Sequence, residues 1–304
     1  MTDPSASGDV GIVIVTYNSE PMIEGLLDSL PAALGDLSAR VVVVDNGSQD
    51  RTCEVVAARA DCLLIPSTNL GYSAGINRGV RELGDVPAYL ILNPDVRMAP
   101  GSIPLLVEAL DIPGTGIIAP RVTTGDGEME LSLRREPTIL RSIGLNWTNL
   151  PLFAEYIGPE RVYARPRTAD WALGAVLLVS AECRRRVGEW DESFFLYSEE
   201  TDYCLRARDL GLATRYVPAA QAVHIGAQSG VSAAIHAMQI VNRVRLYRRR
   251  HTTLAAFAYL MANVLSEITW GLRGHRYSWF AARALLNPRV RPEACGCGDR
   301  LLPR

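Results

Sequence analysis

The chain carries an isolated carboxylate where a ligand is expected. Asp95 ends the segment Leu92-Asn-Pro-Asp95, which follows the apolar run Tyr89-Leu-Ile-Leu92, and the basic residue closest to it in sequence is Arg97. A carboxylate at the end of a buried strand suits a hard divalent cation, which prefers oxygen ligands and can bridge phosphates. The alternative is a Pro-stabilised turn before the next helix, and the segment alone fits both interpretations.

Three more carboxylates crowd the start of a predicted helix. Glu199, Glu200 and Asp202 lie there, where the helix dipole stabilises negative charge. Asp202 can also pair with Arg206 one turn later. Capping accounts for one or two of these acids, which leaves one for chemistry. In the transfer of a group from a diphosphate to a hydroxyl, one carboxylate takes the proton of the attacking hydroxyl. A metal ion that neutralises the departing diphosphate removes the need for a protein acid, so one base and one metal ion are expected.

His224 follows the apolar pair Ala222-Val223 and ends a predicted strand. A lone histidine is more often a hydrogen-bonded core or surface residue than a metal ligand. The presence of Asp95 at another strand end is what makes His224 a candidate second ligand of the same ion.

Polar residues follow each of the first three predicted strands. They are Thr16, Tyr17 and Asn18, then the turn Asp45-Asn-Gly-Ser48, then the segment Asn69–Asn77. Asp45 can accept a hydrogen bond from a nucleobase imide or a ribose hydroxyl. The same turn is also good Asx-turn or helix-cap chemistry, which taken alone is the preferred explanation.

The segment Asn69–Asn77 contains Gly71 and Gly75 and opens a predicted helix. Glycines let a ligand approach the backbone, and a helix N-terminus favours a diphosphate. The segment matches neither a Walker loop nor the dinucleotide fingerprint, so as an isolated motif it is not specific.

Strands and helices alternate along the first 120 residues. Apolar, mostly β-branched runs such as Val10–Val15 are typical of strands buried on both faces. The predicted strands are 10–15, 41–44, 62–65, 88–92 and 116–119, with helices at 19–30, 51–60, 73–83 and 100–110. This alternation predicts a doubly wound, mostly parallel α/β sheet with its ligand site at the carboxyl ends of the strands.

The remaining chain is less regular. Residues 121–166 are predicted to form a hairpin near Gly125-Asp-Gly127 and a long loop. Strands at 175–180, 213–217 and 222–225 and helices at 181–187 and 199–210 follow, and the chain is predicted helical from 231 to about 286. The expected division is a leader (1–9), a catalytic domain (10–230, with halves of about 10–120 and 121–230), a helical region (231–287) and a tail (288–304).

A basic block, Arg243–His251, precedes the apolar stretch Leu254–Leu265. That stretch is too short to span a bilayer, which takes a helix of ~20 residues. Two interpretations stay open: a solvated helix face packed on its own domain, or a basic amphipathic helix on an anionic membrane surface.

The composition is that of a globular protein with a well-buried core. The 304 residues are 48% hydrophobic with a net charge of -2, which argues against a disordered or nucleic-acid-binding protein. The six cysteines are scattered and no secretory signal precedes them, which predicts a cytoplasmic, reducing compartment. No role is assigned to the cysteines, and Cys295 and Cys297 lack the spacing of a zinc site.

The ordered set of motifs resembles glycosyltransferase family 2. The resemblance spans roughly residues 10 to 250 and rests on Val13–Asn18, Val43–Ser48 with Asp50, Asn69–Asn77, Leu92–Asp95, Trp171 with Gly174 and Ala175, and Asp191–Asp202. It implies a Rossmann-like GT-A fold, here with a C-terminal helical extension. It also implies inversion at the anomeric carbon of a sugar and a Mg²⁺ or Mn²⁺ cofactor.

The resemblance implies roles for individual residues. Asp95 matches the metal ligand, His224 the histidine that often completes the metal site, and Glu200 the catalytic base. The family usually has Glu-Asp where this chain has Glu199-Glu200, so Glu199 or Asp202 can substitute. The expected nucleotide-sugar contacts are Thr16, Tyr17, Asn18, Asp45, Asn69, Gly71, Gly75, Asn77, Asn93 and Asp95, and the expected acceptor contacts are Trp171, Gly174 and Ala175. Trp171 is equally well explained as a core residue.

The Asn-Pro-Asp variant and the segment Phe194–Asp202 look most like those of bacterial rhamnosyltransferases that use dTDP-L-rhamnose. Some of these act on polyprenyl-diphosphate sugars, which would suit basic C-terminal helices on the inner face of a membrane. Galactofuranosyl and other hexosyl transferases, including users of UDP-sugars, share the pattern. A sugar nucleotidyltransferase would carry a basic, Gly-rich loop after the first strand. A catalytically inactive nucleotide-sugar-binding module would lose the acids that this chain keeps.

Overall fold

The computed structural model describes residues 8–158, 160–226 and 232–291. Cys295 and Cys297, most of the predicted leader and most of the predicted tail lie outside these ranges. Every structural statement below concerns the described residues.

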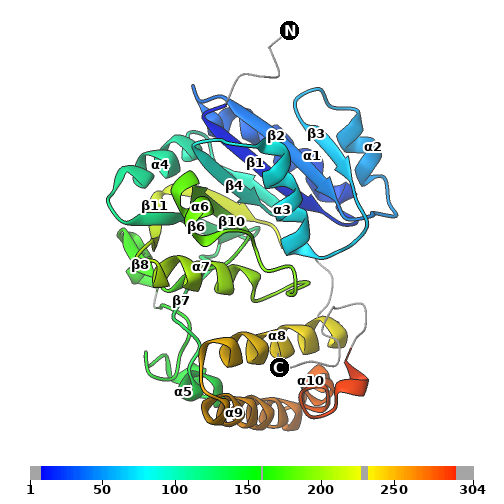
Figure 1. Ribbon diagram of the computed structural model, residues 1–304, viewed down its shortest axis with the longest axis vertical. Helices are drawn as coiled ribbons and strands as arrows, with labels where there is room; N and C mark the ends of the chain where they lie inside the picture. The colour runs from blue at the N-terminus through cyan, green and yellow to red at the C-terminus, as the bar shows by residue number, and fades with distance from the viewer. Residues whose placement is uncertain (1–7, 159, 227–231, 292–304) are drawn as a thin grey trace.

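A nine-stranded sheet forms the centre of the molecule (Figure 1). Its first half runs in the order β3 (Leu63–Pro66), β2 (Ala39–Asp45), β1 (Val10–Thr16) and β4 (Ala88–Leu92), all parallel. The second half continues with β10 (Val176–Ser180), β6 (Thr115–Thr124), β11 (Ala213–His224) and β5 (Val96–Met98), and β8 (Arg167–Ala169) pairs with β11. The sheet confirms the predicted fold class and the parallel order of the first half.

Strand β10 runs antiparallel to both of its neighbours, β4 and β6. The chain reaches β10 from the long irregular segment and not through a helical crossover, so the right-handed crossover rule does not fix its direction. Strand β5, directly after Asp95, was not predicted. The predicted strands 213–217 and 222–225 are one strand, β11, with a register shift between Val217 and Gln221. The hairpin near Gly125 is confirmed by the pairing of Thr123 with Met129.

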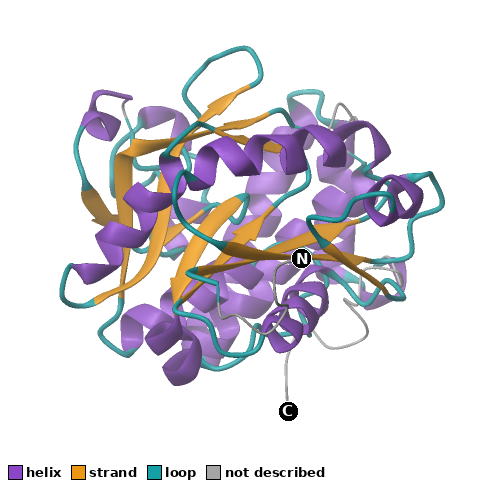
Figure 2. Cartoon of the chain, turned by 90° about the horizontal axis from the view of Figure 1, so that it is seen from above, coloured by secondary structure: helices purple, strands orange, loops and turns teal. Residues whose placement is uncertain are grey.

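Helices cover both faces of the sheet (Figure 2). Because side chains alternate along a strand, Ile12 and Ile14 pack on one side while Val13 and Val15 pack on the other. Helices α1 (Glu20–Leu34), α2 (Thr52–Ala57) and α4 (Ser102–Glu108) bury the first side. Helices α3 (Tyr72–Leu83), α6 (Ala181–Val187) and α7 (Glu199–Asp209) bury the second.

The irregular segment contains several short elements. They are β7 (Leu133–Arg134), paired with β9 (Trp171–Ala172), the helix α5 (Ile139–Ser142), and the 3-10 turns η2 (Asn146–Thr148) and η3 (Glu160–Ala164). Two more 3-10 turns, η1 (Ala109–Asp111) and η4 (Pro288–Val290), follow α4 and the last helix.

The C-terminal region is three helices around a core of their own, at the end of the molecule away from β1–β3 (Figure 1). They are α8 (Ala233–Arg250), α9 (Thr253–Leu272) and α10 (Arg276–Leu286). No helix in the described ranges is long and apolar enough to cross a membrane.

The basic block on α8 packs against the rest of the protein. Arg250 pairs with Asp209 at 2.6 Å, Arg249 pairs with Asp191, and Arg243 pairs with Glu155. These three pairs are what the packed-helix interpretation expects of this block, while contact of the C-terminal helices with a membrane stays a prediction.

Candidate active site

Three segments that are distant in sequence meet at Tyr72, the first residue of α3. Its hydroxyl donates a hydrogen bond to Asn93 Oδ1 at 2.7 Å. Burial raises the pKa of Tyr72, and the nearby charges of Glu199, Glu200 and Asp95 raise it further. The loop after β4 and the start of α7 therefore meet here, at the carboxyl edge of the sheet.

Strand β5 brings Asp95 next to His224. It pairs with the end of β11, so that Val96 lies opposite His224. His224 Nε2 is 3.4 Å from Asp95 Oδ1, which is long for a hydrogen bond, and Nδ1 is 3.1 Å from Glu130 Oε2. Asp95 Oδ1 is buried and has no hydrogen-bond donor within the described ranges.

These residues fit a divalent cation. Two carboxylates, Asp95 and Glu130, lie on either side of His224, and this negative charge suits a cation; the same contacts raise the pKa of the metal-free His224 to about 10. A buried carboxylate oxygen without a donor is a ready ligand for such an ion. Among the described residues no group of three or more His, Cys, Asp or Glu side chains is arranged to hold a metal, so further ligands would come from substrate or water.

Glu130 was not predicted. It lies in the irregular segment, where neither periodicity nor a motif indicates which side chain turns inward. Only the pairing of β6 with the hairpin around Gly125 brings it to His224.

Glu199 and Glu200 begin α7 after two residues in a strained conformation. Tyr197 and Ser198 have φ values of 66° and 76°, in the left-handed region that non-glycine residues rarely adopt. Asn242 of α8 helps to hold this bend, because its Nδ2 donates to the Leu196 carbonyl at 2.9 Å. Strain that the surrounding structure maintains is common at functional sites.

The two glutamates differ in what they face. Glu200 lines a cavity and Glu199 does not, although each has a buried Oε2 without a hydrogen-bond donor in the described part of the chain. Burial raises the pKa of both carboxyls, and the charge of Glu200 adds to the rise at Glu199. The Arg134 guanidinium acts in the opposite direction on Glu200, because a nearby cation favours the ionised carboxylate.

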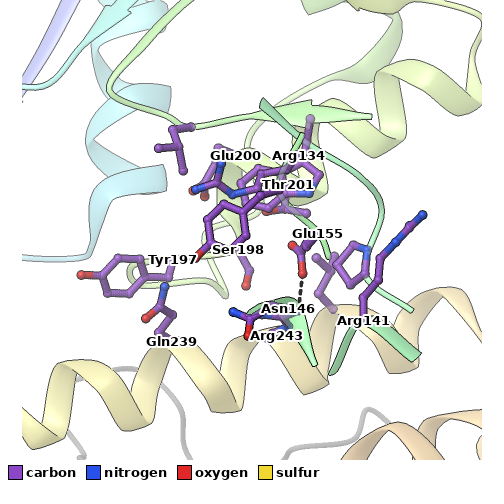
Figure 3. Close-up of a pocket in the computed structure, with 15 residues that line it drawn as sticks. Arg134, Arg141, Asn146, Glu155, Tyr197, Ser198, Glu200, Thr201, Gln239 and Arg243 are labelled. Atoms are coloured by element: carbon purple, nitrogen blue, oxygen red, sulfur yellow. Dashed lines mark hydrogen bonds and ion pairs between the residues drawn. The ribbon is translucent and has the colours of Figure 1, made fainter. Parts of the chain in front are cut away.

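The cavity lies between the start of α7 and helix α8, and has a volume of about 250 Å³ (Figure 3). Arg134 lies in its wall, 4.2 Å from the ring centre of Tyr156. Trp171 also lines it, but only 8% of this residue is exposed and its Nε1 donates to the Arg135 carbonyl at 3.0 Å. Trp171 is thus a core residue with one edge on the cavity.

A family model described as glycosyl transferase family 2 matches residues 11–164. The chain belongs to this family. It is 32% identical over 236 residues to the N-acetylglucosaminyl-diphospho-decaprenol L-rhamnosyltransferase of Mycobacterium tuberculosis, covering 72% of this chain and 76% of the relative. It is 30% identical over 220 residues to a low-salt glycan biosynthesis hexosyltransferase of Haloferax volcanii, covering 71% of this chain and 67% of the relative. The protein is therefore a glycosyltransferase related to rhamnosyltransferases.

Solved structures show the same GT-A fold. The Pyrobaculum calidifontis mannosyltransferase in complex with GDP-Man and Mn²⁺ superposes with a TM-score of 0.57 and 18% identity, covering 97% of this chain and 79% of that one. GalNAc-T7 with UDP, GalNAc and Mn²⁺ gives a TM-score of 0.56 and 14% identity, covering 80% and 48%.

The Asp45 carboxylate of this glycosyltransferase is fully hydrogen-bonded by its own loop and by the end of β1. Its carboxylate accepts hydrogen bonds from the Gly47 and Ser48 backbone N–H groups at 3.0 and 2.8 Å, and from the Ser48 and Thr16 hydroxyls at 2.6 and 2.8 Å. Burial would raise its pKa, but hydrogen bonds from Ser48, Thr16 and Cys53 outweigh burial and lower it. The turn that the sequence left open as an alternative is therefore formed. Tyr17 and Asn18 are exposed beside this loop.

The two glycines of this segment pack closely against protein. A Cβ at Gly75 would lie 2.6 Å from Val15 of β1, so this glycine allows helix and strand to pack closely. Gly71 has a φ of 98°, and a Cβ there would lie 2.5 Å from the Phe195 carbonyl oxygen. Protein packing thus accounts for both glycines, and their contact with a ligand stays a prediction.

The two asparagines of this segment also bond within the protein. Asn77 is buried and exchanges hydrogen bonds with the Trp190 backbone, with both distances 2.9 Å, so a structural role accounts for it. Asn69 is exposed, and its side chain accepts from the Gly71 N–H at 3.2 Å.

Asp202 is not available as a substitute base. Its carboxylate accepts from Arg206 Nε at 2.7 Å, which confirms the predicted pairing one helical turn apart. Gly174 is placed directly behind Glu200, because a Cβ there would lie 3.3 Å from the Glu200 Cβ. Ala175 is buried and its carbonyl accepts from the Asn93 N–H at 3.0 Å, so it supports the site without facing the cavity.

Proposed function

We propose that this glycosyltransferase moves L-rhamnose from dTDP-L-rhamnose to a hydroxyl of a sugar carried on a polyprenyl diphosphate, with inversion. The observation that carries the proposal is Glu200, a carboxylate with a buried, unpartnered oxygen in the wall of a cavity close to Asp95 and Tyr72. The printed activity of the mycobacterial relative supports the choice of donor and acceptor.

Glu200 is the proposed base. The acceptor hydroxyl binds in the cavity and gives its proton to Glu200, and the resulting oxygen attacks the anomeric carbon from the face opposite the nucleotide. The bond between that carbon and the diphosphate oxygen breaks, and the nucleoside diphosphate leaves with the electron pair. Burial of Glu200 helps here, because a carboxylate of raised pKa is a stronger base than one in water.

Asp95 and His224 would hold a Mg²⁺ or Mn²⁺ ion, with Glu130 behind His224 to orient the imidazole. When bound, such an ion neutralises charge that develops on the leaving diphosphate. Asn93 and the exposed Tyr17 and Asn18 are the residues that we propose to contact the nucleotide, while Asp45 and Thr16 shape the loop from behind.

The acceptor side is assigned to the cavity. Arg134, Arg141, Gln239 and Asn146 line it, and Arg243 lies there paired with Glu155, so the two other arginines suit a polar, negatively charged group next to the base (Figure 3). The diphosphate of a lipid-linked sugar meets that description. We place the enzyme on the cytoplasmic side of the membrane, in peripheral contact with it through its C-terminal helices.

The test is transfer by purified protein with Mg²⁺ or Mn²⁺ against dTDP-, UDP- and GDP-sugars, with a short-chain polyprenyl-diphosphate N-acetylglucosamine as acceptor. The expected result is release of dTDP from dTDP-L-rhamnose and a product of inverted anomeric configuration by NMR. The site variants Glu200→Gln and Asp95→Asn are run alongside. Glu24→Gln and Asp36→Asn, both exposed and distant from the site, are their matched controls for the loss of one carboxylate.

A different hexosyl donor is the alternative that the Haloferax relative favours. Turnover of a UDP-hexose but not of dTDP-L-rhamnose would change the proposed donor and leave the proposed catalytic residues unchanged. Binding of nucleotide without turnover of any donor would instead indicate a nucleotide-sugar-binding module.

A further inference from the structure

Helix α9 exposes a continuous apolar stripe. Residues at intervals of three, four or seven lie on one side of it and are between 42% and 79% exposed: Leu254, Phe257, Met261, Leu265 and Leu272. The opposite side, with Tyr259, Asn263 and Glu267, is buried, and Tyr259 belongs to the helical core. The apolar side chains of the stripe therefore make no use of the core and stay exposed on the surface of the bundle.

The outer side of α10 continues this surface. Arg276, Trp279, Arg283 and Leu286 recur at helical spacing and are all exposed. Trp279 packs on α9, because a Cβ at Gly271 would lie 2.5 Å from its indole ring. Gly271 precedes Leu272, so the two rows adjoin. We call these nine residues, five on α9 and four on α10, the α9–α10 face; it lies along the edge of the molecule opposite β1–β3 (Figure 1).

The charge of this region has one sign. Residues 232–291 contain ten arginines and a single acid, Glu267, although the whole chain has a net charge of -2. Glu267 is buried and bonded to His236 at 2.8 Å. Arg273, Arg276, Arg283 and Arg289 are exposed, so the apolar stripe is bordered by cations and α9 and α10 expose no carboxylate.

We propose that the α9–α10 face docks the protein on a bilayer that contains anionic lipid. An apolar row with an interfacial tryptophan and bordering arginines is the pattern of a helix that lies in the membrane–water interface, where apolar side chains enter the acyl boundary and arginines pair with lipid phosphates. The basic block on α8 is left out of this face, because three of its arginines, Arg243, Arg249 and Arg250, pair with the rest of the protein.

Docking on this face brings the lipid surface close to the active site. A second cavity of about 120 Å³ is lined by Asn263, Ser266, Glu267 and Trp270 of α9. It shares Arg141, Asn146 and Arg243 with the cavity that holds Glu200. The thickness of one helix, ~10 Å, thus separates the lipid from the row of cavities. The docking deepens the peripheral membrane contact of the proposed function by naming the face and the lipid, and this step rests in addition on the proposed lipid-linked acceptor.

The test is sedimentation of the full chain with vesicles of phosphatidylcholine, with or without about a third of phosphatidylglycerol. The double variant Phe257→Ser/Leu265→Ser is expected to bind the anionic vesicles about tenfold more weakly, because two large apolar side chains no longer enter the lipid. Leu63→Ser/Ile112→Ser is the matched control, since these residues are 46% and 42% exposed far from α9 and should leave binding unchanged.

A charge variant tests the contribution of the bordering arginines. Arg276→Glu/Arg283→Glu is expected to weaken binding to the anionic vesicles by roughly tenfold or more and to leave the weak binding to neutral vesicles unchanged. Arg185→Glu, at an exposed position on α6, is the control. Thermal unfolding of each variant confirms that it is folded.

Equal vesicle binding by the wild type and both surface variants would overturn the proposal, as would absence of binding by the wild type. A dimer that the serine variant abolishes, without vesicle binding, would overturn it in favour of contact between two copies. Asp95→Asn separates this result from the proposed function, because an inactive enzyme should still bind vesicles. The serine variant should likewise keep donor turnover with a water-soluble acceptor.

Discussion

Asp45 and Asp95 both lie where a parallel strand of the sheet ends, yet the protein treats them in opposite ways. The Asp45 carboxylate accepts four hydrogen bonds from its own loop and from β1. The Asp95 carboxylate has a buried oxygen that makes no hydrogen bond in the described part of the chain, with His224 Nε2 3.4 Å away, and Glu199 and Glu200 each have a buried oxygen without a hydrogen bond.

A buried acceptor without a donor destabilises the folded state, so it persists where binding or catalysis requires it. The loop after β2 is thus built for stability, whereas the edge between β4 and α7 keeps carboxylates free at a cost in stability. Substitutions at the two places should therefore affect activity and folding in opposite proportions.

The largest effect is expected from Glu200→Gln. Loss of the base should lower kcat roughly 10²- to 10⁴-fold, with little change in nucleotide affinity. The melting temperature at pH 7.5 should stay the same or rise, because a neutral amide costs less to bury than a carboxylate. Transfer assays and calorimetry with Glu199→Gln alongside will check this, and an equal or greater loss of kcat in Glu199→Gln would move the base to Glu199.

Asp95→Asn should lower metal-dependent transfer by about 10²- to 10³-fold, because charge on the leaving diphosphate is worth several kcal/mol in the transition state. Binding of Mn²⁺ in the presence of dTDP, followed by isothermal titration calorimetry, should weaken in parallel. The midpoint of urea unfolding without metal should not fall. A clear loss of stability would mean that Asp95, like Asp45, stabilises the fold.

Asp45→Ala should behave in the opposite way. It leaves four donors without their acceptor and should lower the free energy of unfolding by about 3 kcal/mol. Because the folded pKa of Asp45 is lowered, its contribution is present above the pKa of an ordinary aspartate and is lost as pH falls through the lowered value. Urea unfolding at pH 7 and at pH 3 measures both, and a pH-independent difference would show that the carboxylate charge is not responsible.

The smallest expected effect is a shift in pH dependence. Ionised Glu200 is needed as the base, so kcat/KM should rise with pH through an apparent pKa above that of an ordinary glutamate. Arg134→Gln removes a cation that favours the ionised form and should move this acid limb to higher pH by up to about one unit. An unchanged limb in the variant would mean that Arg134 does not influence the base.

Several features of the site were predictable from the sequence because they are local. Buried β-branched runs and helical spacing located β1–β4 and α1, α3 and α7, and motifs at two strand ends and at one helix start singled out Asp95, His224 and Glu200 as candidates. The pairing of Asp202 with Arg206 followed from helix geometry alone. Short-range patterns carry this information because a helix turn or a strand end is defined by residues close together in the chain.

The packing of the glycines and the hydrogen bonds of Asn77 could not be predicted from the sequence, for the opposite reason. Gly75 packs against Val15, and Asn77 exchanges hydrogen bonds with the Trp190 backbone. Neither partner can be identified from the residues around the motif. Glu130 was missed because its segment has no periodic pattern.

The sequence by itself determined the family, the class of sheet and the positions along the chain at which carboxylates reach its ligand edge. Tertiary structure alone decided which of these carboxylates are free, the direction of β10, and which C-terminal helix remains exposed. A side chain is available for chemistry only if no other segment satisfies its hydrogen bonds or covers its surface. Those partners come from residues tens to more than a hundred positions away, which are brought close only by folding.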